Sequence, residues 1–578
     1  MRPSAVSQTI VPDLHATRVQ AAVDRLATQR FIPRLWDKDA SLWSPDPAVQ
    51  RAIRQRLGWL SIVPVMEARL EEIRAVAETI RRAGFTHALL LGMGGSSLFS
   101  EVCRFTFGVA PGWLDLAVLD STDPVAITRA TERAPLERTL FIVSSKSGTT
   151  TESSALGDHF YEQLRSRKGE QAGQHFVAIT DVGTPLEAQA HERRFRQVFA
   201  HGPTSGQDVG GRFSALTCFG LVPTALMGLD IRQLLSRAKE MLAACQPSVP
   251  LSDHPAAQLG ACLSEAAASG RDTVTLLCAP PMARFGLWAE QLIAESTGKI
   301  GKGLTPIHGE SIRDPAAYSS DRLFVELQLA NELDAAVART VEALAKAGHP
   351  VVRLQWRDRY DLGGEVIRWS MAIAIAGGLM QLNPFDEPNV QESKDRTNAL
   401  LERYAREGAL PAEQPIMTEQ DIAVYADPNM ASGRSVAESL QGWLQQIRAG
   451  DYVALTSFLP RTNALDPVVE SLRNRLGEVT GVATMLGYGP RYLHSTGQLH
   501  KGGPDRLALL FLTSDDPLDV PIPGKPYTFS VLKQAQALGD YQALQERRRR
   551  VLRLHLGRSP EQGLQRLLGL LDGMKTRG

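Results

Sequence analysis

The chain has 578 residues, of which 43% are hydrophobic and 22% are charged, and its 63 Lys and Arg are balanced by 63 Asp and Glu. This length exceeds what one hydrophobic core supports, so we expect roughly three or four domains of ordinary size. The composition excludes a disordered or fibrous protein, and the balanced charge excludes a net field that would draw the whole chain to nucleic acid or an anionic membrane. Any anion that this protein binds must therefore be held by a local site.

The cysteines and the N-terminal segment predict the compartment. The five cysteines include no CxxC pair, which argues against a disulfide framework and against a zinc site. The first residues contain no apolar signal segment, and no stretch is long enough to span a bilayer. The longest apolar run, around residues 371–382, contains Gly377 and Gly378 and is interpreted as a buried helix. These patterns predict a reduced, cytoplasmic protein without a membrane or nucleic-acid partner.

The first 84 residues are predicted to be helical. Two amphipathic segments stand out, residues 19–31 and 65–84, and the second ends at Gly84 as a helix C-cap does. From residue 85 onward, short apolar runs alternate with helix-length segments, which is typical of βαβ units around a parallel sheet. A first doubly wound domain is expected over residues 85–240, with five strands, and a second over residues 241–405. Strands in these two domains are predicted at residues 86–92, 114–120, 139–145, 175–181, 273–279, 322–329 and 350–356.

The C-terminal part is predicted to form a smaller α/β unit. Residues 406–433 are rich in Pro, Ala and acidic side chains and are interpreted as a linker. The unit that follows spans residues 434–578, with strands at 451–459, 481–487, 506–513 and 550–557. The basic run at residues 547–550 is interpreted as a solvated helix end. The fold class is therefore α/β, with two doubly wound parallel-sheet domains and an additional C-terminal unit.

Two loops, each between a strand and a helix, carry residues suited to anion binding. The first is GMGGSS (residues 92–97), in which Gly95 and Ser96 could approach a ligand, although a tight structural turn is the alternative. The second is SSKSGTTTE (residues 144–152), whose dense hydroxyls at a helix N-terminus favour a small phosphorylated ligand. It lacks the spacing of a nucleotide-binding P-loop. Its alternative is a Ser/Thr-rich cap completed by Glu152 as a capping box.

These loops, with three further motifs, carry a family resemblance. The motifs are DVGGRFS (residues 208–214), QLIAESTGK (residues 291–299) and NPFDEP (residues 383–388), the last running on to Lys394. Together, in this order, they resemble the phosphoglucose isomerase family of sugar isomerase (SIS) domain proteins over roughly residues 30–405. The resemblance implies that the two doubly wound domains are SIS domains. It also implies reversible, cofactor-free and metal-free isomerisation of glucose 6-phosphate and fructose 6-phosphate in a homodimeric enzyme of glycolysis and gluconeogenesis.

The resemblance also implies roles for individual residues. Glu295 is the expected isomerising base, Arg212 stabilises the enediolate, Lys394 assists ring opening and Gln291 contacts the sugar. The phosphate is expected on Gly95, Ser96, Ser145, Lys146 through its amide, Ser147, Thr149 and Thr150. The chemistry fits these residue types, because an aldose–ketose isomerase needs a base between C1 and C2 and a cation beside the enediolate. The alternative for Glu295 is an ordinary surface glutamate, for Arg212 a structural ion pair, and for Lys394 a solvated lysine on a helix.

The family's ring-opening histidine is not where the resemblance expects it. In the family it lies in a His-Gln-Gly-Thr segment soon after the catalytic glutamate and typically comes from the neighbouring subunit, whereas here only His308 follows Glu295 closely. The segment YLHSTGQLHKG (residues 492–502) resembles it in displaced form. His500 is the preferred ring-opening residue, and His494 is the competing choice. The extended C-terminus resembles a variant fused behind a transaldolase, for which 578 residues leave no room, so isomerase activity alone is expected.

Two other functions compete with this prediction. One is an isomerase of broader specificity that also accepts mannose 6-phosphate. The other is a sugar-phosphate sensor, which would bind through residues 145–150 without turnover. The joint presence of Gln291, Glu295, Arg212 and Lys394 disfavours the sensor, which needs only a phosphate site.

Overall fold

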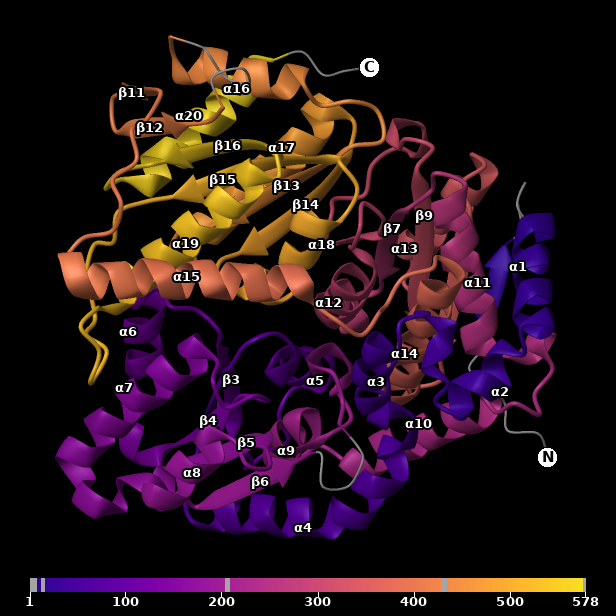
Figure 1. Ribbon diagram of the computed structural model, residues 1–578, viewed down its shortest axis with the longest axis horizontal. Coiled ribbons are helices and arrows are strands. Elements are labelled where there is room, and N and C mark those ends of the chain that lie inside the picture. The colour runs from indigo at the N-terminus through magenta and orange to yellow at the C-terminus, as the bar shows by residue number, and fades with distance from the viewer. Residues whose placement is uncertain (1–7, 12–15, 203–207, 428–433, 575–578) are drawn as a thin grey trace.

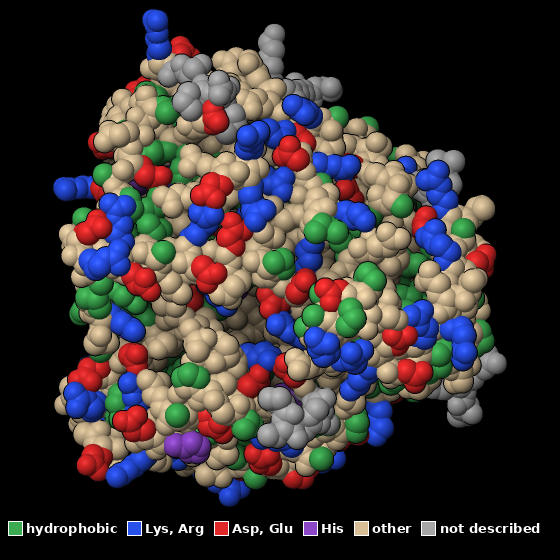
Figure 2. Space-filling view, in the orientation of Figure 1, with side chains coloured by type: hydrophobic (Ala, Val, Ile, Leu, Met, Phe, Trp, Pro, Cys, Tyr) green, Lys and Arg blue, Asp and Glu red, His purple; other side chains and the backbone are tan. Residues whose placement is uncertain are grey.

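The computed structural model describes residues 8–11, 16–202, 208–427 and 434–574. They form three α/β units, each built on its own sheet with helices packed against it (Figure 1). Over these described ranges, no helix is long and apolar enough to cross a membrane. Lysine and arginine side chains alternate with acidic ones over the face shown in Figure 2, which is hollowed near its centre.

The first sheet is fully parallel, with strand order β3-β2-β4-β5-β6. Its strands are β2 (His87–Gly92), β3 (Asp115–Leu119), β4 (Thr139–Ser144), β5 (Phe176–Asp181) and β6 (Gln197–His201). The helices of this unit are α5 (Leu98–Phe107), α6 (Pro124–Arg133), α7 (Thr151–Lys168), α8 (Pro185–Glu192) and α9 (Cys218–Leu226). Every residue of the central strands β4 and β5 is buried, because helices cover both faces of the sheet. The expectation of five strands is confirmed.

The second sheet has the order β1-β10-β9-β7-β8. Its parallel strands are β7 (Thr273–Cys278), β8 (Thr305–His308), β9 (Arg322–Leu329) and β10 (Val351–Trp356). The edge strand β1 (Gln8–Val11) runs antiparallel to β10. The expectation that the first 84 residues are only helical was therefore wrong for residues 8–11, which find their partner far away in sequence. The described residues 16–82 are mainly helical, with α1 (Ala16–Thr28), α2 (Phe31–Trp36), α3 (Pro47–Gln55) and α4 (Ile62–Arg82).

Closely packed helices join the first two units. They are α10 (Ile231–Ala244), α11 (Pro255–Ala268) and α14 (Leu362–Leu379), with α12 (Phe285–Thr297) packed on α14. Helix α13 (Ala335–Lys346) packs on β10 instead. The helix α14 is the buried helix that the apolar run predicts. Small residues let these helices approach: a Cβ at Gly363 would overlap the carbonyl oxygen of Leu234, and one at Gly260 would lie 2.7 Å from that of Ala372. A single hydrophobic core runs from the N-terminal helices into both units.

The third sheet has the order β11-β12-β16-β15-β13-β14. Its strands are β11 (Met417–Glu419), β12 (Ile422–Tyr425), β13 (Tyr452–Ser457), β14 (Ala483–Tyr488), β15 (Leu507–Thr513) and β16 (Arg550–His555). The linker expectation for residues 406–433 is corrected here, because β11 and β12 form an antiparallel hairpin that pairs with β16; residues 428–433 lie outside the described residues. The hairpin makes this sheet six-stranded, one strand more than either of the others.

All three units share one strand arrangement. In each, the first parallel strand lies between the second and the third: β2 between β3 and β4, β7 between β8 and β9, and β13 between β14 and β15. This is the doubly wound order, in which ligands bind outside the carboxyl ends of the strands. The long helix α15 (Pro388–Glu407) leaves the second unit and lies between the first and the third, where it packs on α19 (Phe529–Glu546) (Figure 1). The third unit's other helices are α16 (Val436–Gln445), α17 (Leu465–Thr480), α18 (Gly497–Gly502) and α20 (Pro560–Asp572).

We predict opposite effects for alanine at two helical glycines. Gly363→Ala should lower the midpoint of thermal unfolding, because its Cβ would overlap the backbone of α10, and overpacking typically costs about 1–3 kcal/mol. Gly569→Ala in α20 meets nothing within 4 Å, so it should raise the midpoint slightly, since alanine is favoured over glycine in helices by about 0.5–1 kcal/mol. Scanning calorimetry of both variants tests this, and equal effects would contradict the packing argument.

Candidate active site

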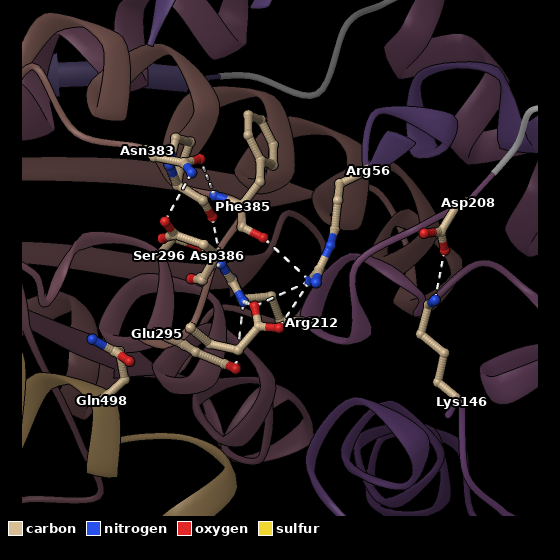
Figure 3. A network of polar contacts seen from close by, with 12 residues as sticks. Arg56, Lys146, Asp208, Arg212, Glu295, Ser296, Asn383, Phe385, Asp386 and Gln498 are labelled. Carbon is tan, nitrogen blue, oxygen red and sulfur yellow. Dashed lines mark hydrogen bonds and ion pairs between the residues drawn. The ribbon is translucent and has the colours of Figure 1, made fainter. Parts of the chain in front are cut away.

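The hydroxyl-rich loop between β4 and α7 forms one wall of a cavity. Within the loop, Ser145 Oγ donates to Thr150 Oγ1 at 2.9 Å, and Ser147 Oγ lies 2.9 Å from Thr149 Oγ1. The side chain of Lys146 forms ion pairs instead, with Asp181 at 2.6 Å and Asp208 at 2.5 Å, the second of which Figure 3 shows. Its ammonium group is thus neutralised, which is compatible with the expected use of its backbone amide.

The cavity has a volume of about 270 Å³ and takes its walls from all three units. The first unit contributes the loop and the N-terminus of α7, whose dipole favours an anion. Helix α15 contributes Lys394, and the third unit contributes His494 and Gln536. The structure therefore brings five of the predicted residues together here: Ser147, Thr149, Thr150, Lys394 and His494.

Buried hydrogen bonds fix the position of His494. It ends the 3₁₀ helix η12 (Arg491–His494), which follows the carboxyl end of β14. Its Nε2 lies 2.8 Å from Glu152 Oε1, and the same oxygen accepts a hydrogen bond from Gln536 Nε2 at 2.7 Å. Thr150, which precedes α7, makes no side-chain cap, so the capping-box alternative for Glu152 is not what the structure shows. Instead, Glu152 orients the histidine, as a carboxylate does in catalytic pairs.

The glycine-rich loop makes room for neighbouring site residues. Gly94 has φ of +53°, and a Cβ there would lie 2.7 Å from Gln291 Nε2 and 2.8 Å from the carbonyl oxygen of His494. A Cβ at Gly95 would overlap the carbonyl oxygen of Gly211, in the turn that carries Arg212. The carbonyl oxygen of Ser96 accepts from Ser144 Oγ at 2.9 Å, which ties this loop to the end of β4.

The guanidinium of Arg212 is the centre of a buried polar network (Figure 3). Its side chain is 1% exposed. Nε donates to Ser296 Oγ at 2.7 Å, and Nη2 donates to the carbonyl oxygens of Pro384 at 2.5 Å and Asp386 at 3.0 Å. Nη1 faces two carboxylates, Glu387 at 3.1 Å and Glu295 at 3.4 Å. The arginine is therefore held rigidly, with its positive charge directed at both Glu387 and Glu295.

The two carboxylates beside Arg212 have opposite electrostatic behaviour. Burial raises the pKa of Glu295, against the attraction of Arg212, and the charge of Glu387 raises it further. Burial also opposes ionisation of Glu387, but Arg212 and Arg56 outweigh it and hold the pKa of Glu387 at about 2. Arg56 lies 2.9 Å from Glu387. Glu387 is therefore a permanent counter-charge, while Glu295 is poised to take up a proton.

Gln291 connects the Arg212 network to the cavity. It lies one helical turn before Glu295 on α12, as the spacing predicts, and its Nε2 donates to Glu295 Oε2 at 3.1 Å. The same nitrogen donates to the carbonyl oxygen of His494 at 2.8 Å. Among the described residues that line the cavity, Glu295, Gln291 and Arg212 are absent. Gln291 is one hydrogen bond from the backbone of His494, and Glu295 is reached through Gln291.

His500, preferred from the sequence, lies elsewhere. It is 1% exposed inside the third unit, between the rings of Tyr452 and Tyr492, with Nε2 3.4 Å from Met485 Sδ. Burial lowers its pKa to about 3. A histidine that is neutral and enclosed by apolar groups cannot reach a sugar in this cavity. The geometry therefore favours the competing choice, His494.

Sequence reasoning missed three residues of this site: Glu152, Glu387 and Gln536. Two of them stand inside quoted motifs, Glu152 at the end of the hydroxyl-rich loop and Glu387 in NPFDEP, and carboxylates in such motifs were a usable signal. Gln536 had no such signal in the sequence, because it lies in the middle of α19, far from every motif.

Comparisons with known proteins identify the family of the chain. A sequence model of the phosphoglucose isomerase family matches residues 60–305. A glucose-6-phosphate isomerase of Synechococcus sp. (strain JA-3-3Ab) is 30% identical over 360 residues, covering 55% of this chain and 66% of that one. A probable glucose-6-phosphate isomerase of Haloarcula marismortui is 30% identical over 351 residues, covering 54% of this chain and 77% of that one.

Solved structures show the same fold. A hypothetical protein from Thermus thermophilus superposes with a TM-score of 0.58 at 24% identity, covering 68% of this chain and 99% of that one. A glucose-6-phosphate isomerase from Chlamydia trachomatis superposes with a TM-score of 0.53 at 17% identity, covering 67% of this chain and 86% of that one.

The sequence relatives place the chain among the aldose–ketose isomerases that act on a sugar phosphate. The chain belongs to the phosphoglucose isomerase family. Its reaction is the reversible isomerisation of glucose 6-phosphate and fructose 6-phosphate.

We predict that His500→Leu flattens the acid dependence of stability. The folded chain holds His500 neutral with a pKa of about 3, whereas the unfolded chain protonates it below about 6.5. The unfolded state therefore binds more protons as the pH falls from 6.5 toward 4, and wild type loses about 1 kcal/mol per pH unit from this group. Thermal unfolding midpoints across this window should fall less in the variant, with turnover retained. A variant as acid-sensitive as wild type would contradict the assignment.

Proposed function

We propose that Glu295 is the base that moves the proton between C1 and C2 of the sugar phosphate through an enediol. The observation that carries this role is its carboxylate, 9% exposed, held between the guanidinium of Arg212 and the amide of Gln291. Removal from water raises its pKa, which suits a group that must both accept and return a proton.

Arg212 stabilises the negative charge of the enediolate. Its donors are already fixed by Ser296 and by the carbonyl oxygens of Pro384 and Asp386. A cation held in place before the reaction, in a site that excludes water, stabilises developing charge without reorganisation. Gln291 positions the base and contacts the sugar.

His494 opens the sugar ring, assisted by Lys394. Both line the cavity, and Glu152 holds the imidazole by the 2.8 Å contact at Nε2. Ring opening moves a proton between the C1 hydroxyl and the ring oxygen, which a histidine does well near neutral pH. The histidine donates to Glu152, whose pKa this contact lowers against the effect of burial.

The phosphate binds at the loop of residues 145–150, with the glycine-rich loop nearby. Hydroxyls of Ser147, Thr149 and Thr150 line this end of the cavity, and the N-terminus of α7 favours an anion. The resemblance adds Ser145, the amide of Lys146, Gly95 and Ser96 to this site. It also supports a cytoplasmic homodimer acting in glycolysis and gluconeogenesis.

Replacing the base should abolish isomerisation while leaving binding intact. Glu295→Gln keeps the shape and the contact with Gln291 but cannot accept a proton, so turnover should fall about 10²–10⁴-fold. A coupled assay from fructose 6-phosphate, with chelator present, measures turnover, and calorimetry measures binding. Binding without turnover by wild type itself would instead indicate a sensor.

Replacing His494 should separate ring opening from isomerisation. Anomers of glucose 6-phosphate interconvert by ring opening alone, which NMR exchange measures without the coupled assay. We expect His494→Gln to slow anomer exchange and isomerisation, and Glu295→Gln to slow isomerisation only. The control is His555→Gln, at a histidine of the same unit that ends β16 and pairs with Asp515, outside the cavity. Unchanged anomer exchange in His494→Gln would overturn the assignment.

The acid limb of the pH profile should depend on Glu387. The base must be ionised, so kcat/KM rises with pH through the pKa of Glu295, which burial and Glu387 raise. Glu387→Gln removes a negative charge that raises the pKa of Glu295 and leaves the opposing attraction of Arg212 in place. The acid limb should therefore move to lower pH. Profiles of kcat/KM for both enzymes test this, with unfolding midpoints as the control; a shift to higher pH would contradict it.

A further inference from the structure

The family match ends at residue 305 and leaves the third unit without an assigned role. This unit repeats the doubly wound strand order of the other two. The turn that follows the carboxyl end of its strand β14 lies at the cavity. The turn carries His494, so the carboxyl end of this sheet serves the same cavity as the carboxyl end of the first sheet, where the phosphate loop lies.

We infer that the third unit completes the catalytic site within a single chain, so that turnover does not require residues from a second copy of the protein. This inference rests on the proposed role of the cavity in catalysis.

Contacts with the first unit hold the turn in place. Arg491, three residues before His494, forms ion pairs with Glu101 and Asp120, both at 2.5 Å, and its side chain is only 14% exposed. Buried Gln536 donates to Glu152 and accepts from Thr122 Oγ1 at 2.8 Å. Lys533, one turn before Gln536 on α19, pairs with Asp123 at 2.8 Å. Paired buried charges at this seam mean that its geometry is fixed by the fold.

Contacts with the second unit hold the segment after His494 in place. Gln498 Nε2 donates to the carbonyl oxygen of Gly298, which follows α12, at 2.9 Å, and to Asn389 Oδ1 on α15 at 2.7 Å (Figure 3 shows Gln498 beside the network). A Cβ at Gly298 would lie 2.5 Å from Leu499 Cα, so α18 packs directly on the end of the catalytic helix. The amide of Gly301 donates to the carbonyl oxygen of Gly502 at 2.9 Å.

These contacts place the segment that holds His494 between the phosphate loop and Glu295. Gln291 bonds to Glu295 and to the carbonyl oxygen of His494 from the same nitrogen, so the base and the ring-opening residue share a hydrogen-bonded link inside one chain. Gln536 acts as a positioning residue, through Glu152 rather than on the sugar. The third unit thus supplies these groups from within the same chain.

The test uses full-length chains with two different tags, co-expressed and purified over both affinity columns so that only mixed assemblies remain. One pairing joins wild type with a chain that carries both Glu295→Gln and His494→Gln. Completion within one chain predicts about half of the wild-type activity per chain, because one intact site survives. Sites shared between chains predict activity near that of the double variant, which would overturn the inference.

The reciprocal pairing joins Glu295→Gln with His494→Gln. Here, completion within one chain predicts no gain over the separate variants, whereas shared sites predict recovery of about half of wild-type activity. A pairing of Glu295→Gln with His555→Gln is the matched control, and it should show the half-activity of one intact chain.

Dilution of the wild-type enzyme tests the inference independently of His494. Specific activity should stay constant from micromolar to nanomolar chain, whether light scattering shows assemblies or single chains. A loss of activity that follows dissociation would overturn completion within one chain. Normal turnover of the His494→Gln chain alone would refute the proposed role of His494 but would leave the dilution result to decide on the inference.

Discussion

The buried guanidinium of Arg212 is the constraint on which the site depends. A fully desolvated positive charge is tolerated only when its donors are satisfied, and here they are satisfied by groups from separate parts of the chain: Ser296 on α12, the carbonyl oxygens of Pro384 and Asp386, and the carboxylates of Glu387 and Glu295. Satisfying one arginine therefore fixes the turn after residue 210, the catalytic helix and the loop before α15 relative to one another.

Close approach between backbone segments fixes the uncharged parts of the site relative to one another, as Arg212 fixes the charged parts. The glycine-rich loop can lie against the Gly211 turn and the His494 turn only because Gly94 and Gly95 carry no Cβ. The same reason applies at Gly298, where α18 meets α12. Charges and glycines together bring the carboxyl ends of the first and third sheets to one cavity, which α15 of the second unit also lines. Helix α12 of the second unit contacts the His494 turn through Gln291. The proposed mechanism depends on that convergence, since no single unit holds the proposed base, cation, ring-opening residue and phosphate loop.

The division of labour between Glu295 and Glu387 shows how environment assigns roles to like side chains. Both are glutamates beside Arg212. Glu387 has a second arginine, Arg56, and stays ionised, whereas Glu295 has a neutral amide as its second partner and burial raises its pKa. Two carboxylates whose pKa values are pushed apart in this way are typical of acid–base catalysis. Neither pKa follows from the motif alone.

The sequence by itself determined the α/β class, the parallel strands of all three units except β6 and the short β8, and the motifs that hold Glu295, Arg212 and the phosphate loop, because strand periodicity, glycine turns and hydroxyl clusters are local signals. It did not determine β1 or the β11–β12 hairpin, whose few residues become strands only beside β10 and β16. It also favoured His500 over His494, which stands in the same short segment. Only tertiary structure separates them, because the turn after β14 points one imidazole at Glu152 and the helix that follows buries the other between tyrosines.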